Sequence, residues 1–123
     1  MDVTPLVAKD RQVIESYGAS GFRVSGNSYY GAILVLPQAT QPWRVAAIAD
    51  ISAASLAPVV ESGIQILLLG CGRHMQLVPP ALRQDLRAHG VVIDAMDTGA
   101  ACRTHNVLLA EDRRVAAALL PAG

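Results

Sequence analysis

Hydrophobic runs separated by polar, glycine-containing turns fill the second half of the chain and predict alternating strands and helices. Short continuous apolar runs are typical of buried strands, whereas longer segments with apolar positions three or four residues apart are typical of helices. The predicted elements are strands at 64–69, 91–95 and 114–119 and helices at 80–89 and 99–110. The segment 64–95 has the length of a βαβ crossover, so we expect its two strands to be parallel.

Shorter apolar segments in the first half lie between closely spaced glycines at positions 18, 21, 26 and 31. Segments of this length, bounded by Gly, Ser and Asn, favour strands joined by tight turns. We therefore expect a small antiparallel β region with strands at 13–17, 22–24, 32–36 and 44–48.

A short helix is expected within 52–61, although it contains Pro58. Proline in a helix interior costs about 3 kcal/mol, but it is tolerated in the first turn. Ser55 is the predicted N-cap because this start places Pro58 in the first turn. Gly63 is expected to end the helix.

Taken together, the elements predict one compact α/β domain over residues 1–123. Its mixed central sheet contains the βαβ crossover of the C-terminal half, and the N-terminal half adds an antiparallel β layer. A chain of 123 residues with 52% hydrophobic composition can bury one core without disulfides or a metal ion.

Charge and composition narrow the possible partners and compartments. Ten basic and ten acidic side chains give no net charge, so nucleic acid is not an expected partner. No apolar run approaches the roughly 20 residues needed for a membrane span. The chain has two cysteines and starts without a basic, apolar signal sequence, which predicts free thiols and a cytoplasmic location. Because the chain has no net charge and a high hydrophobic content, an apolar surface patch through which it forms a homo-oligomer is also possible.

Two glycine-containing polar turns follow the strands at 64–69 and 91–95 and form the candidate site. Loops after parallel strands open on the same sheet edge, where ligands usually bind. The free N–H groups that start the next helix attract anions, and arginines could add charge. The candidate ligand-binding residues are Gly70, Cys71, Gly72, Arg73, Asp97, Thr98 and Arg103. In the alternative interpretation, the glycines only allow the turns, and Asp97 or Thr98 only caps the helix.

Other motifs do not identify a reaction. The Gly70-Cys71-Gly72 turn lacks the remaining features of a dinucleotide or P-loop motif. Cys71 could be a reactive thiol near a helix N-terminus, or an inert small side chain. The His and Cys spacings match no zinc site, and no catalytic triad motif occurs, so we expect no metal, cofactor or catalytic residue.

The helix at 99–110 has one face suited to packing on the sheet. This face collects Ala101, Cys102, His105, Leu108 and Leu109. His105 is therefore interpreted as a hydrogen-bonded core residue rather than a catalytic base, and Cys102 as core. Arg103 and Asn106 lie on other faces, where we expect them to contact something outside the domain.

Motifs along nearly the whole chain resemble one family. In the C-terminal part they are Leu-Leu-Leu-Gly-x-Gly at 67–72, Met96-x-Thr98, Arg103-Thr104-x-Asn106-Val107-Leu108 and Glu111-x-Arg113-x-Val115; Ser16-Tyr17-Gly18, Phe22-Arg23, Gly31, Pro37 and Trp43 extend them. They resemble a family of uncharacterised single-domain proteins that includes mitochondrial complex I assembly factor 3 and the adipogenesis-associated domain proteins.

The resemblance implies a compact α/β domain with an extra β layer beside a mixed sheet, and it supplies no catalytic residues. The chain departs from the family at three positions: Cys71 replaces a frequent Thr, Asp94 the usual Glu, and His105 the usual Tyr or Phe. The change at His105 agrees with a core role, whereas Cys71 weakens any role that needs a hydroxyl there.

Two functional hypotheses follow. The first is a non-enzymatic cytoplasmic protein that binds other proteins during the assembly or maturation of a larger complex. The second is a domain, which could be an enzyme, that binds a small molecule or anion in a cleft between 70–74 and 96–103.

Overall fold

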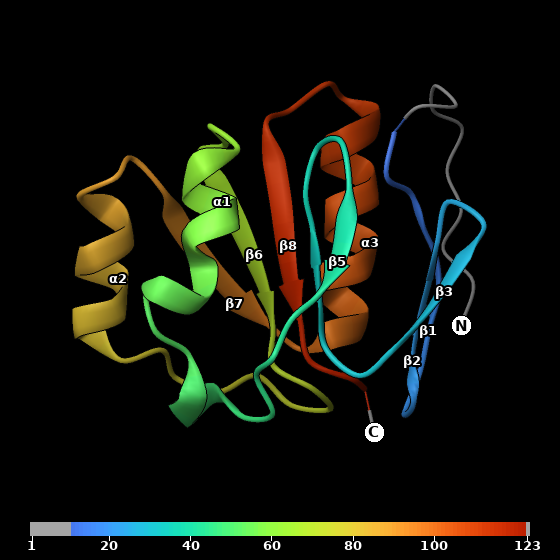
Figure 1. Cartoon of the computed structure of the whole chain (residues 1–123), viewed down its shortest axis with the longest axis horizontal. Helices are drawn as coiled ribbons and strands as arrows, with labels where there is room; N and C mark the ends of the chain where they lie inside the picture. The colour runs from blue at the N-terminus through green and yellow to red at the C-terminus, as the bar shows by residue number, and fades with distance from the viewer. Residues whose placement is uncertain (1–10, 123) are drawn as a thin grey trace.

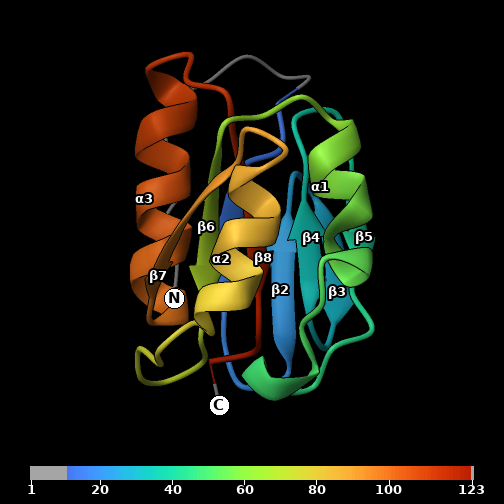
Figure 2. The same ribbon diagram turned by 90° about the vertical axis from the view of Figure 1, so that its left-hand side faces the viewer.

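The fold is built on a five-stranded sheet with a covering layer on each face. The computed structural model describes residues 11–122, and its helices α1 and α2 cover one face. Helix α3 and a separate three-stranded sheet cover the other face (Figures 1 and 2). Two hydrophobic cores therefore lie on opposite faces of the large sheet.

The elements have the following bounds. The strands are β1 (Ile14–Tyr17), β2 (Gly21–Val24), β3 (Asn27–Tyr30), β4 (Ile33–Val35), β5 (Thr40–Pro42), β6 (Ile66–Gly70), β7 (Val92–Met96) and β8 (Val115–Leu119). The α-helices are α1 (Ala57–Glu61), α2 (Pro80–Arg87) and α3 (Thr98–Ala110), and the 3-10 helices are η1 (Ile48–Asp50) and η2 (Ala54–Leu56).

The large sheet is mixed, with the strand order β5-β4-β8-β6-β7. Strand β6 is parallel to both β7 and β8, whereas β4 is antiparallel to β5 and β8. The predicted βαβ crossover is confirmed as β6-α2-β7. All five residues of β8 are buried, which fits a strand covered on both faces.

The first three strands form the predicted antiparallel layer, in the order β1-β2-β3. This small sheet is joined to α3 by the side-chain amide of Asn106. Its Oδ1 accepts from Ile14 N at 3.1 Å and its Nδ2 donates to Ile14 O at 2.8 Å. The amide thus satisfies both backbone groups at the edge of β1, as a neighbouring strand would.

Two sequence predictions in the first half were wrong. The segment 44–48 is not a strand, and β4 belongs to the large sheet, where it pairs with β5. Trp43 and Val45 are buried, so the apolar residues that suggested a strand here belong to a loop that packs on the core. The Trp43 indole N–H donates to Ser55 O at 3.0 Å and fixes this loop against η2. Strand β3 was not predicted from its polar sequence.

The helix at 57–61 is short, and Pro58 lies in its first turn, as expected. The predicted N-cap was wrong, because the cap position is Leu56 and makes no side-chain hydrogen bond. Ser55 lies in η2, and its hydroxyl donates to Ser52 O at 2.7 Å. This local bond supports a 3-10 turn ahead of the helix. Over residues 11–122, no helix has the length and apolarity needed to span a membrane.

Candidate functional site

The two glycine-containing turns meet at the edge where β6 and β7 end, as the parallel pairing required. Cys71 N donates to Met96 O at 2.9 Å, and Thr98 N donates to Gly72 O at 2.8 Å. A Cβ atom at Gly70 would lie only 2.9 Å from Thr98 Oγ1 and 3.1 Å from Thr98 Cα. The turns are therefore in direct contact, and no ligand-sized space separates them at this point.

Thr98 connects three segments through one buried hydroxyl. Its Oγ1 accepts from Gly72 N at 2.9 Å and donates to Leu120 O at 2.6 Å. This bond ties the turn after β6 to the chain that leaves β8. Asp97, rather than Thr98, is the N-cap of α3, and its carboxylate accepts from Ala100 N at 2.9 Å. Both side chains thus have structural partners already.

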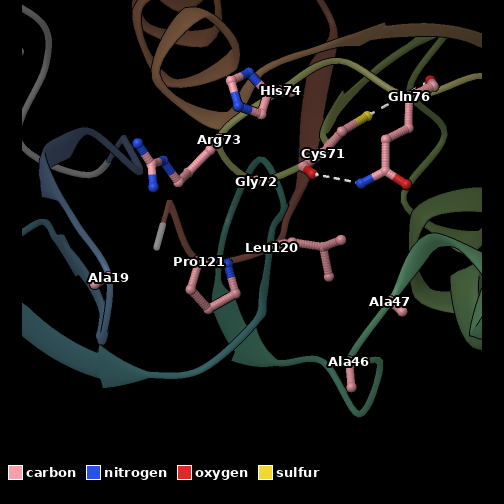
Figure 3. A pocket seen from close by; sticks show the side chains of 10 residues that line it. All are labelled: Ala19, Ala46, Ala47, Cys71, Gly72, Arg73, His74, Gln76, Leu120 and Pro121. Atoms are coloured by element: carbon pink, nitrogen blue, oxygen red, sulfur yellow. Dashed lines mark hydrogen bonds between the residues drawn. The ribbon is translucent and has the colours of Figure 1, made fainter.

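A concavity of about 530 Å³ opens beside these turns (Figure 3). It is lined by Ala19, Ala46, Ala47, Cys71, Gly72, Arg73, His74, Gln76, Leu120 and Pro121. Residues 71–74 of the predicted site contribute to its lining, whereas no residue of 96–103 does. The structure therefore divides the predicted site.

Arg103 lies away from this concavity. Its Nη1 donates to the Tyr17 hydroxyl at 2.9 Å, so the guanidinium contacts the small sheet instead of joining Arg73. The four segments that line the concavity are the β1–β2 turn, the loop before η1, the loop after β6 and the chain after β8. Sequence reasoning missed the first two and the last, because no local motif marks them.

Cys71 is buried at the inner side of the concavity, with 3% exposure. Its Sγ is 3.8 Å from Leu69 O and 3.9 Å from Gln76 O, and Gln76 Nε2 donates to Cys71 O at 3.2 Å. These contacts hold the loop closed around the thiol (Figure 3). The environment matches a small packed side chain better than an accessible nucleophile.

The loop between β6 and α2 is exposed from Arg73 to Leu77. Met75 is 56% exposed and Leu77 is 86% exposed, so two large apolar side chains of this loop, one on each side of Gln76 in the sequence, face solvent. Apolar residues within a polar loop were the available sequence signal for this surface.

The buried face of α3 is confirmed, and its two titratable groups are enclosed. Burial lowers the pKa of His105 to about 4, although a 3.2 Å contact between its Nδ1 and Asn106 Oδ1 acts in the opposite direction. Burial raises the pKa of Cys102 to about 12. His105 is thus a neutral core residue, as interpreted. The expectation for Asn106 was wrong, because it is 2% exposed and bonds Ile14.

Among residues 11–122, no group of three or more His, Cys, Asp or Glu side chains is placed to hold a metal ion. Arg73 and His74 are the lining residues of the concavity that can carry positive charge. With an apolar floor and a basic rim, this arrangement can bind a group that combines an apolar part with a negative charge.

Comparison with known proteins identifies close relatives over most of the chain. An NADH dehydrogenase [ubiquinone] 1 alpha subcomplex assembly factor 3 from Danio rerio is 38% identical over 111 residues, which cover 89% of this chain and 64% of that protein. An uncharacterised protein of Rhodobacter capsulatus is 37% identical over 88% of this chain and 83% of its own. This chain thus spans about three-fifths of the length of the vertebrate assembly factors it matches.

A solved structure is also similar to this chain over nearly its whole length. A protein of Bartonella henselae described as an outer membrane protein superposes with a TM-score of 0.84 at 36% identity, covering 92% of this chain and 97% of its own. The model of a family described as "Protein of unknown function (DUF498/DUF598)" matches residues 14–120. The chain therefore belongs to the DUF498/DUF598 family.

Proposed function

We propose that this protein is a cytoplasmic, non-catalytic assembly factor that binds subunits of a larger complex. The observation that carries the proposal is the 38% identity to a protein named as an assembly factor for NADH dehydrogenase, over 89% of this chain. The proposed clients are accordingly subunits of an NADH dehydrogenase.

The structure supports a binding role over a catalytic one. Cys102 and His105 are enclosed in the core, and Asp97 and Thr98 are engaged in holding the backbone. In contrast, the loop that follows β6 presents Met75 and Leu77 to solvent. Exposed apolar side chains beside a concavity are typical of protein interaction surfaces.

The test uses two strains of the protein's own host. In one, the protein carries a tag and is isolated at its native expression level; in the other, its gene is deleted. We expect NADH dehydrogenase subunits to co-purify in stoichiometric amounts, as seen by native mass spectrometry. We also expect the deletion strain to contain less assembled enzyme, with unchanged activity per assembled molecule. Normal assembly in the deletion strain, together with no co-purifying subunit, would contradict the proposal.

A further inference from the structure

We propose that the concavity beside the β6–α2 loop binds an extended segment of a partner protein that carries a large apolar side chain next to a carboxylate. This inference rests on the proposed binding function and assigns it to one surface. That surface consists of the ten residues lining the concavity together with Met75 and Leu77, and we refer to it as the β6–α2 loop surface.

The floor of the surface is apolar and lined by small side chains. Ala19 stands on one side and Ala46 and Ala47 on another, with Leu120 and Pro121 between them (Figure 3). Because three of these residues are alanines, the walls leave open space instead of filling it. A volume of about 530 Å³ is large enough to admit a large apolar side chain from a partner.

The charge of the rim selects the second feature of the segment. None of the ten lining residues is acidic, and Arg73 is an exposed arginine among them. Across residues 11–122, its guanidinium has no hydrogen bond or ion pair with another side chain. A guanidinium binds carboxylate with paired, charge-assisted hydrogen bonds. His74 lies beside it and adds positive charge when protonated (Figure 3).

The exposed apolar side chains indicate a protein segment rather than a small ligand. Leu77 is 86% exposed and Met75 is 56% exposed, and both belong to the loop that contributes five residues to the lining of the concavity, Cys71, Gly72, Arg73, His74 and Gln76. A small molecule seated in the concavity would leave them in water, whereas an extended chain can cover the concavity and the loop together. Methionine and arginine are also enriched at protein interfaces.

The test uses a random peptide library displayed on phage and panned on the purified full chain. We expect enriched sequences to place a large apolar residue within about two positions of Asp or Glu, since an extended chain spans at most ~3.5 Å per residue. The most enriched peptide, labelled with fluorescein, then gives dissociation constants by fluorescence anisotropy.

Four variants separate the two parts of the surface from general effects. Ala46→Trp fills the concavity and Arg73→Glu reverses the rim charge; each should raise the dissociation constant at least about tenfold, equivalent to ~1.4 kcal/mol. Both positions are exposed, so the fold should be retained, which circular dichroism checks. Matched controls at the opposite end of the sheet, Ala110→Trp and Arg113→Glu, should change it less than about twofold.

Three outcomes overturn the inference. In the first, panning on the wild-type chain enriches no peptide that panning on the Ala46→Trp variant fails to enrich. In the other two, the enriched peptides lack acidic residues, or the Ala46→Trp and Arg73→Glu variants bind the peptide as tightly as the wild type does. These outcomes differ from a failure of the assembly-factor proposal. If NADH dehydrogenase subunits co-purify equally with wild type and both variants, the surface is wrong and the function stands. If the peptide binds as expected but assembly is normal without the gene, the surface stands and the function is wrong.

Discussion

Replacing Thr98 with valine should destabilise the protein far more than its small chemical change suggests. Valine keeps the shape of threonine but removes the hydroxyl that accepts from Gly72 N and donates to Leu120 O. Each intramolecular hydrogen bond contributes about 1 kcal/mol net, and leaving a buried partner unsatisfied adds to the loss, so we expect roughly 2–3 kcal/mol. For 123 residues, an unfolding entropy of about 2.1 cal/mol/K per residue converts this loss to a Tm decrease of roughly 10 °C.

Urea titration monitored by circular dichroism measures the free energy of unfolding, and two variants serve as controls. Thr98→Ser retains the hydroxyl and should recover at least about half of the loss, since it lacks only a methyl group worth ~1 kcal/mol. The second control is Thr104→Val on the same helix. Thr104 is half-buried and its side chain makes no hydrogen bond within residues 11–122, so this change should lower the free energy of unfolding by less than about 0.5 kcal/mol. The reasoning would be refuted if Thr98→Val and Thr104→Val were equally stable.

Three further results are expected. Between about pH 7 and about pH 4.5, the free energy of unfolding should fall by roughly 2.5 kcal/mol more in the wild type than in His105→Phe. The pKa of His105 is about 4 in the folded protein and about 6.5 in the unfolded chain, so in this range only the unfolded chain takes up the proton. An equal pH dependence of the two proteins, measured by urea titration, would exclude this assignment. With Ellman's reagent, Cys71 and Cys102 should both react slowly in the folded protein and at once in denaturant, because both are buried; rapid labelling of the folded protein would show an accessible thiol. Gly70→Ala should cost about 1–3 kcal/mol by overpacking, whereas Gly18→Ala, with no atom within 4 Å of the new Cβ, should be nearly neutral, and similar melting temperatures for the two would contradict the contact geometry.

The second half of the fold could be predicted because its signals are local. Strand β6 is a run of apolar residues followed by glycine, and α3 has a buried face at helical spacing, so each segment indicates its own structure. Parallel pairing then follows from the length of the crossover. The meeting of the two turns at one edge is a geometric consequence of that pairing, which is why it could be predicted too.

The remaining elements depend on partners that are distant in sequence. Strand β5 is Thr-Gln-Pro and becomes a strand only by pairing with β4, whereas the mostly apolar segment 44–47 is a loop and Ile48 begins η1. Likewise, Asn106 is a polar residue whose burial depends on the edge of β1, 92 positions away. The concavity is lined by segments that no spacing rule connects, so its position became visible only in three dimensions.

The position of β8 determines when this protein can fold during synthesis. It follows every other described strand in the chain, yet it lies between β4 and β6 in the sheet. Until it leaves the ribosome, the β4–β5 pair and the β6–β7 pair have no shared strand, and the inner edges of both expose unpaired backbone groups. The nascent chain must therefore carry two incomplete half-sheets until residues 115–119 emerge, a period in which a chaperone could recognise them.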